Sequence, residues 1–323
     1  MRTLMHFIGL ALLIYLLSIL NYHTLAASIL KAKPAFLIIA FLLLVPVYLI
    51  KAWRWKFMLR LQGIHYPYRD AFLGFWSSNF IAFVTPGRLG EVAKAFYLMK
   101  DKGLPFSSSL PTVVFDRLFD MYTLWMFSVA GAVVFATGRI GMLNWLLVTV
   151  LLVFPLLIFW KGMVKGFFNA FLSLPLLNRY RSGFLRGLDG FYQEVSALVH
   201  WKSIGGLLLT IAAYLILFYC SYWISRASAS DLPYMQVSYF MAVVALLSFL
   251  PITIAGFGTR EAALVILFSQ ISRSREEAIL FSTLYFFVFF ALGGLMGYFC
   301  FLLKPVEFKK LKAFAKKPAA DTV

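Results

Sequence analysis

The sequence predicts an all-α protein that crosses a membrane several times. Of its 323 residues, 62% are hydrophobic and only 13% are charged, whereas a soluble domain carries about 25% charged residues. The apolar residues form long continuous runs and do not alternate with polar ones, which favours helices over the strands of a barrel. Helices and closed barrels are the structures that satisfy every backbone group in hydrocarbon. Composition and pattern together therefore predict a polytopic α-helical membrane protein.

The charged residues are distributed as in a membrane protein. The formal net charge of +17 comes from 30 Lys and Arg against 13 Asp and Glu. In a soluble protein this balance would suggest nucleic-acid binding. Here the basic residues lie mainly between the apolar runs, as the positive-inside rule describes. We therefore expect membrane lipids and no nucleic acid as partners, with both termini on the cytoplasmic side of the cell membrane.

Eight hydrophobic segments divide the chain. Six are long enough to cross a bilayer, which needs about 20 residues, and two are short and interrupted. The first segment resembles a signal peptide, but the spans that follow favour an uncleaved first helix. Full spans are expected at about residues 4–20, 34–50, 110–136, 142–160, 204–224 and 278–303, a basic loop at 51–69, and interrupted segments at 71–99 and 237–269.

The segments form one transmembrane domain, residues 1–303, with two similar halves at roughly 35–136 and 204–303. Residues 161–202 are amphipathic and are expected to lie at the membrane interface. The basic tail, residues 304–323, is expected on an anionic cytoplasmic leaflet.

The two interrupted segments resemble each other. Each has an apolar arm, a break containing glycine, and then an Arg and a Glu. Three full spans separate them, so as re-entrant broken-helix hairpins they would enter from opposite faces, which makes an inverted-topology repeat with its binding site near the midplane. Alternatively, the Gly and Pro residues only kink helices for packing. The residues that break the hairpins are Pro86, Gly87 and Gly90 in the first, and Pro251, Gly256 and Gly258 in the second.

Charged residues inside a bilayer are costly and mark functional sites. Arg88 and Arg260 follow the two breaks and are the candidates for holding a phosphate, because a guanidinium binds it through two parallel hydrogen bonds. Asp116 and Asp120 share one helix face, whereas Arg117 points about 100° away. Alternatively, these charges form ion pairs that clamp the hairpins. The candidate substrate-binding residues are Arg88, Arg260, Glu91, Glu261, Lys94, Asp116, Arg117 and Asp120.

Signatures of catalysis are weak. The four histidines are scattered and lack the spacing of metal ligands, and no nucleophile elbow, phosphate-binding loop or dinucleotide fingerprint is found. Neither cysteine has a neighbour of the kind that binds metal. We therefore expect no enzyme activity, no cofactor and no metal.

Three motifs resemble the flippase-like transmembrane family named for the membrane part of lysylphosphatidylglycerol synthases. They are Pro86-Gly87-Arg88-Leu89-Gly90-Glu91, Phe115-Asp116-Arg117 and Gly256-Phe257-Gly258-Thr259-Arg260-Glu261. The resemblance covers about residues 5–303 and implies a lipid-handling membrane domain. In the synthases this domain is joined to a soluble aminoacyl-transfer domain. About twenty residues follow the last span here, so the synthase activity is not expected.

The leading functional hypothesis is a lipid flippase, or a translocator of a lipid-linked anionic intermediate, with its headgroup between the two hairpins. The alternatives are an ion-coupled secondary transporter of a small anionic solute, a membrane enzyme acting on a lipid, and a non-catalytic partner of a lipid or glycan synthesis enzyme. A second copy of the chain, forming a homodimer, is a further partner that the sequence leaves open.

Overall fold

The computed structural model describes residues 28–135, 160–173, 178–249 and 258–305, together with residues 14, 149 and 256. All regular secondary structure among these residues is helical, which confirms the predicted all-α fold. The predicted spans at 4–20 and 142–160, Pro251 and the tail from residue 306 lie outside the described residues, apart from single positions.

Four stretches among the described residues are long and apolar enough to cross a membrane. They are α3 (Pro34–Leu61), α6 (Phe106–Phe135), the stretch Trp201–Ala227 made by the turn η3 (Trp201–Ser203) and α10 (Ile204–Ala227), and the stretch Arg275–Leu303 made by α13 (Arg275–Phe286), η5 (Phe287–Leu292) and α14 (Gly293–Leu303). Each has 27–30 residues, more than the roughly 20 that a bilayer needs. They confirm four of the six predicted spans.

Helix α3 extends beyond the predicted span. The sequence predicts a basic loop directly after residue 50, but the helix continues to Leu61 and ends before Gly63, whose φ is +76°. The prediction of a loop is wrong because no helix-breaking residue separates the apolar run from the basic residues. Lys51 and Arg54 therefore lie inside the bundle, buried on the face that α3 presents to α6 and α10.

The first interrupted segment folds as two antiparallel helices. Helix α4 (Tyr68–Phe83) is followed by the 3₁₀ turn η1 (Pro86–Val92) and by α5 (Ala93–Lys102). The chain reverses at Gly87 and Arg88, which both have left-handed backbone angles. Gly90 then packs against α4 so closely that a Cβ there would lie 2.5 Å from the Ala82 nitrogen.

The second interrupted segment also reverses direction. Helix α11 (Tyr234–Leu247) precedes the break and α12 (Thr259–Ser269) follows it. Near the break, a Cβ on Gly256 would lie 3.1 Å from Ser248 Oγ. Away from the break, the rings of Phe240 and Phe268 are 5.8 Å apart. The two helices are therefore antiparallel as well.

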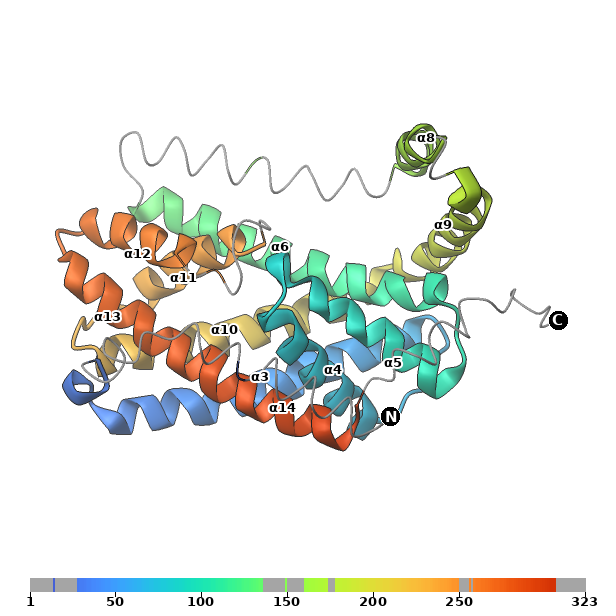
Figure 1. Ribbon diagram of the computed structural model, residues 1–323. Coiled ribbons are helices and arrows are strands. Elements are labelled where there is room, and N and C mark those ends of the chain that lie inside the picture. Colours follow the sequence, from blue (N-terminus) through green and yellow to red (C-terminus); the bar gives the residue numbers. More distant parts are fainter. Residues whose placement is uncertain are drawn as a thin grey trace.

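In each helix pair, the helix ends that lie away from the break point toward one end of the bundle, and the two pairs point toward opposite ends (Figure 1). At one end, Asp70 at the start of α4 and Asp101 at the end of α5 both bind Lys304, directly after α14. At the other end, α12 leads into the start of α13. The breaks therefore lie between the two ends. Whether the pairs are re-entrant hairpins of an inverted repeat in the bilayer stays a prediction.

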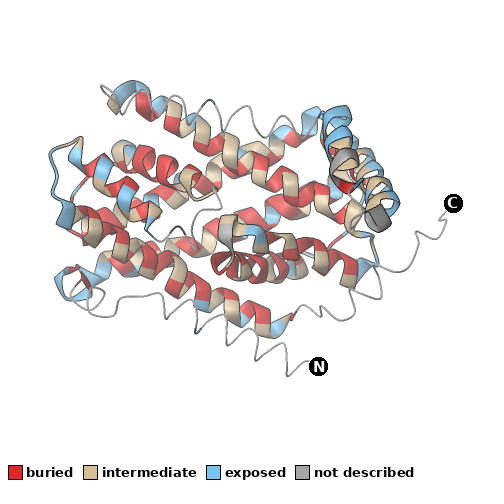
Figure 2. Cartoon of the chain, turned by 45° about the horizontal axis from the view of Figure 1, so that its top comes forward, coloured by how far each residue is buried: buried red, intermediate tan, exposed pale blue. Residues whose placement is uncertain are grey.

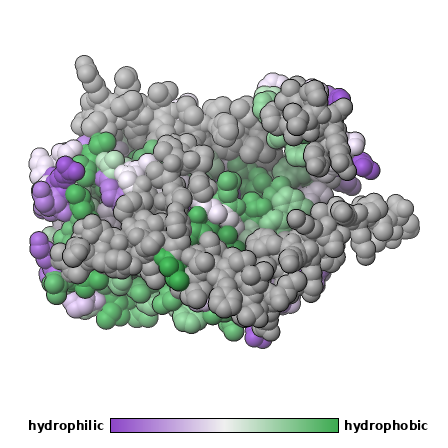
Figure 3. Space-filling model, viewed as in Figure 1, coloured by the Kyte–Doolittle hydropathy of each residue, from purple (hydrophilic) through white to green (hydrophobic). Residues whose placement is uncertain are grey.

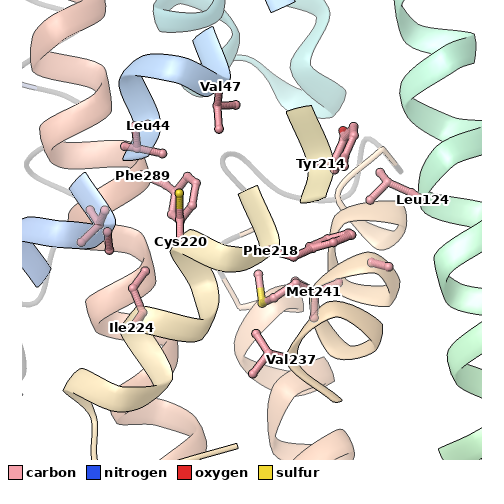
Figure 4. Packing of buried hydrophobic residues seen from close by; sticks show 14 of the residues in the cluster. Leu44, Val47, Leu124, Tyr214, Phe218, Cys220, Ile224, Val237, Met241 and Phe289 are labelled. Atoms are coloured by element: carbon pink, nitrogen blue, oxygen red, sulfur yellow. The ribbon is translucent and has the colours of Figure 1, made fainter. Parts of the chain in front are cut away.

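Burial follows the predicted membrane architecture. Figure 4 shows α10 contributing Phe218 and Cys220 to the same core as Leu44 of α3 and Met241 of α11. Exposed residues collect at the ends of the bundle and on α8 (Lys161–Leu172) and α9 (Asn178–Leu198) (Figure 2). On the face in Figure 3, hydrophilic residues gather at the left-hand end and around α8 and α9, and the described surface between them is apolar.

Candidate functional site

The two breaks meet at one internal cavity. Its volume is about 50 Å³, which is enough for a few water molecules or a small anion. Gly87 and Arg88 line it from the first break, and Gly256 and Arg260 line it from the second. Segments about 170 positions apart in the sequence thus place an arginine each on the same space.

Arg88 is held by the geometry of the first break. Its backbone is left-handed (φ 58°), a conformation that costs free energy in non-glycine residues and is enriched at functional sites. Its Nη2 donates to Asn79 Oδ1 at 2.6 Å, and Asn79 Nδ2 donates to the Tyr48 hydroxyl at 2.5 Å. The guanidinium carbon lies 5.7 Å from the ring centroid of Phe83. About a third of the side chain is exposed (31%).

Arg260 is more enclosed, with only 3% of the residue exposed. Its Nε donates to Ser282 Oγ at 2.9 Å, and its Nη2 contacts Glu261 Oε1. Glu261 also accepts from Ser282 Oγ at 2.8 Å and, through Oε2, from the Gly258 nitrogen at the start of α12. The remaining nitrogen, Nη1, is buried and has no hydrogen-bond partner among the described residues. It is therefore the atom of this side chain that remains available to a ligand.

Aromatic rings connect the two arginines. The guanidinium of Arg260 lies 5.1 Å from the ring of Phe286 and 5.6 Å from that of Phe290. Phe290 packs against Phe83 with 4.7 Å between ring centroids. It belongs to η5, a π-helical turn within the last span, and such turns occur often at functional sites.

A network of buried ion pairs lies beside the cavity. It connects α3, α6 and the first break. Its members are Lys51 and Arg54 of α3, Glu91 of η1, Lys94 of α5, and Asp116, Arg117 and Asp120 of α6.

The carboxylates of α6 bind α3. Arg54 Nη2 lies 2.6 Å from Asp116 Oδ1, and Arg54 Nη1 lies 2.7 Å from Asp120 Oδ1. Asp120 is also 3.4 Å from Lys51 Nζ and 2.6 Å from Arg117 Nη2. The sequence places Asp116 and Asp120 on one face, and the structure agrees. Arg117 reaches the same cluster although it was expected about 100° away, because its side chain is long.

Glu91 connects the first break to this network. Its Oε2 lies 2.6 Å from Arg117 Nη2 and 3.0 Å from Lys94 Nζ, and Lys94 also contacts Asp116. Arg88 is more distant, with its Nε 3.7 Å from Glu91 Oε1. Arg88 therefore shares a carboxylate that two closer cations already bind.

The predicted site residues fall into two groups. Arg88, Arg260, Gly87 and Gly256 line the cavity. The others, Glu91, Lys94, Asp116, Arg117, Asp120 and Glu261, form ion pairs that support it. This arrangement is consistent with the alternative interpretation of those six as clamps, and their contact with a ligand stays a prediction.

Several members of the site are absent from the sequence-based prediction. The sequence-based prediction places Lys51 and Arg54 in a loop, although their i,i+3 spacing directly after an apolar run indicates one face of a continuing helix. Asn79 and Ser282 give no distinctive sequence signal. Among the described residues, no group of His, Cys, Asp and Glu is arranged to hold a metal ion.

Fold and site together define a class: a polytopic α-helical membrane protein in which two broken helix pairs place arginines on one internal cavity. The chain belongs to the family described as the lysylphosphatidylglycerol synthase transmembrane region, whose model matches residues 6–297. It is also similar to a UPF0104 membrane protein of Methanocaldococcus jannaschii, with 23% identity over 329 residues that cover 96% of this chain and 97% of the relative. No solved structure matches the chain significantly.

Proposed function

We propose that the protein translocates a phospholipid or a lipid-linked anionic intermediate across the cytoplasmic membrane, with the phosphate held between Arg88 and Arg260. One observation carries this proposal: arginines from both breaks line the same internal cavity. Guanidinium groups bind phosphate through paired hydrogen bonds, and in a site of low dielectric the attraction is strong.

The arrangement of the helix pairs supports transport over simple binding. The pairs open at opposite ends of the bundle and meet at the cavity. In the proposed mechanism they are re-entrant hairpins of an inverted repeat, and movement of one pair against the other exposes the cavity to each side in turn. The family to which the chain belongs is consistent with a membrane domain that handles lipid.

The size of the cavity limits what it encloses. A volume of about 50 Å³ admits a phosphate-sized group and excludes a complete headgroup with its acyl chains. In the proposed mechanism the tails stay in the bilayer, and the site widens when it is occupied.

The test is translocation of fluorescent phospholipids in liposomes reconstituted with the purified protein. Arg88→Ala should reduce the translocation rate at least several-fold, because it removes the more accessible of the two cavity arginines. Arg273→Ala is the matched control, because Arg273 is 41% exposed and pairs with a surface glutamate 3.5 Å away. Equal rates for wild type and Arg88→Ala would show that the proposed site is wrong.

The small cavity favours a second candidate, an ion-coupled transporter of a small anionic solute. Such a transporter needs a closed polar cavity and no path for acyl chains. Uptake of a radiolabelled anion such as inorganic phosphate into the same liposomes, without lipid translocation, would favour this candidate. A non-catalytic role beside a lipid or glycan synthesis enzyme stays a prediction, which co-purification would test.

A further inference from the structure

The interior of the described part of the chain contains more positive than negative charge. The ionisable groups of the network and of the two breaks are six cations and four carboxylates. The cations are Lys51, Arg54, Arg88, Lys94, Arg117 and Arg260, and the carboxylates are Glu91, Asp116, Asp120 and Glu261. When all are ionised, two positive charges have no counterpart among them.

The other carboxylates of the described chain have different partners or lie at helix ends. Asp70 and Asp101 bind Lys304, Asp189 binds Lys161 and Lys165, and Asp231 binds Arg226. Glu194 accepts from Gln62, and Glu276 and Glu277 lie in the first turn of α13. None of them is paired with the six interior cations.

The excess charge belongs to the network and the first break, where five cations face three carboxylates, whereas Arg260 has Glu261 as its own partner. Asp116, Asp120 and Glu91 each contact at least two cations of the network. Glu261 pairs with Arg260 but leaves its Nη1 buried without a hydrogen-bond partner. Arg88 has a carboxylate only at 3.7 Å. Arg88 is therefore the cavity arginine without a close carboxylate, and the Nη1 of Arg260 is a second buried donor on a residue that lines the same cavity.

A buried charge without a counterion is costly in a medium of low dielectric. An anion that supplies two negative charges between Arg88 and Arg260 would balance the interior. An anion with one charge would leave one cation uncompensated. A site of this kind would distinguish ligands by charge, in addition to hydrogen bonding.

We propose that the cavity selects a doubly charged phosphate group, a phosphomonoester or a diphosphate, over the singly charged phosphodiester of common phospholipids. This inference rests on the proposed function and names the class of its substrate. The volume of about 50 Å³ agrees with it, because a terminal phosphate enters such a space without a second substituent. The phosphate is carried either by a lipid or by a free anion, and both share the chemistry that the arginines bind.

The test compares two short-chain lipids with identical acyl chains, dihexanoyl phosphatidate and dihexanoyl phosphatidylglycerol. Binding to the purified full-length protein in an uncharged detergent is measured by isothermal titration calorimetry. Wild type should bind the phosphatidate about tenfold more tightly, a difference of about 1.4 kcal/mol. Equal binding, or tighter binding of phosphatidylglycerol, would overturn the proposal.

Charge variants separate selection from a general loss of structure. Arg260→Gln and Arg88→Gln each remove one charge and should reduce the preference to about threefold or less, whereas Arg260→Lys should retain most of it. Arg273→Gln is the control and should leave the preference unchanged, with melting temperatures showing that each variant is folded. A preference that survives in both cavity variants would contradict the assignment.

The pH dependence gives a second signature. The second pKa of a phosphomonoester is about 6, so the phosphatidate loses its extra charge between about pH 7.5 and about pH 5. The preference over phosphatidylglycerol should therefore shrink at the lower pH. Protonation of the protein's carboxylates would add positive charge and would strengthen the binding of both lipids. A preference that is constant or grows on acidification would overturn the proposal.

Inorganic phosphate identifies the source of the anion. If it displaces the phosphatidate with similar affinity, the site takes a free dianion. If the acyl chains are required, the site takes a lipid. Both results support selection by charge.

The charge preference and the proposed transport would be refuted by different results. Equal binding of both lipids with translocation intact refutes only the charge preference, whereas preferential binding without lipid translocation refutes only the proposed transport.

Discussion

Asn79 determines where the guanidinium of Arg88 lies. Its Oδ1 accepts from Arg88 Nη2 at 2.6 Å, and its amide is fixed by the Tyr48 hydroxyl, whose ring stacks on Trp76. The amide is neutral, so it orients the arginine and leaves its charge available to a ligand. An acidic residue at the same place would neutralise the arginine and remove the reason for an anion to bind.

Two substitutions of Asn79 should therefore have graded effects on phosphatidate affinity. Asn79→Ala should weaken binding moderately, about five- to tenfold, because Arg88 keeps its charge but loses its orientation. Asn79→Asp should weaken binding more, because it adds a carboxylate beside Arg88. Isothermal titration calorimetry measures the phosphatidate affinity of both variants, and their melting temperatures show that they are folded. A purely structural role for Asn79 predicts the reverse order, since Asp preserves the acceptor that Ala removes.

At the scale of an element, the first break depends on Gly90. A Cβ at this position would lie 2.5 Å from the Ala82 nitrogen and 2.6 Å from the Ile81 oxygen, which are both backbone atoms. Gly90→Ala must therefore push η1 away from α4. We expect it to lower the free energy of unfolding by about 1–3 kcal/mol and to slow translocation, because Arg88 moves with η1.

The control for this substitution is Gly166→Ala in α8, where an added Cβ meets nothing within 4 Å. Alanine is a better helix former than glycine, so this variant should be as stable as wild type or more so. Thermal melting measures both variants. An equally stable Gly90→Ala protein would show that η1 is not packed against α4 as described.

At the scale of the whole molecule, one group of contacts fastens the first helix pair to the last span. Lys304 Nζ lies 2.6 Å from Asp70 and 2.5 Å from Asp101, and the Tyr97 hydroxyl donates to the Lys304 oxygen at 2.7 Å. Burial and a hydrogen bond to Asp101 raise the pKa of Tyr66, which accepts a further bond from Lys304. These contacts, called the clasp below, hold the start of α4 and the end of α5 against the last span.

Lys304→Met should release the clasp and increase the exposure of α14. Cys300 is a native reporter, because it lies one turn before Lys304 and is 7% exposed. In a Cys220→Ser background, a membrane-permeant maleimide should label Cys300 several-fold faster in Lys304→Met than in the parent. Lys102→Met, at an exposed lysine outside the clasp, should leave the rate unchanged. An unaltered rate in Lys304→Met would show that the clasp does not hold the helix pair in place.

The sequence predicts the helices and the breaks more accurately than it predicts the contacts between side chains. The four described spans and both breaks follow from local signals, namely the length of apolar runs and the position of Gly and Pro. The convergence of Arg88 and Arg260 on one cavity agrees with the prediction from the similarity of the two interrupted segments. The partners of these residues could not be predicted, because Asn79 and Ser282 are ordinary polar residues until the fold brings them close. The end of α3 differs from the prediction because basic residues after an apolar run usually indicate a loop, whereas here buried carboxylates on α6 stabilise Lys51 and Arg54 inside the helix.

The π-helical turn η5 allows the helical register of the last span to change locally. A π-helical turn holds one residue more than an α-helical turn, and each residue corresponds to about 100° of rotation. If the extra residue passes to a neighbouring turn, the segment between the two positions rotates while Ser282 and Lys304 stay anchored at either side. Phe290 lies in this segment and contacts both Arg260 and Phe83. A shift of this kind would move Phe290 relative to Arg260 while the two ends of the span stay in place.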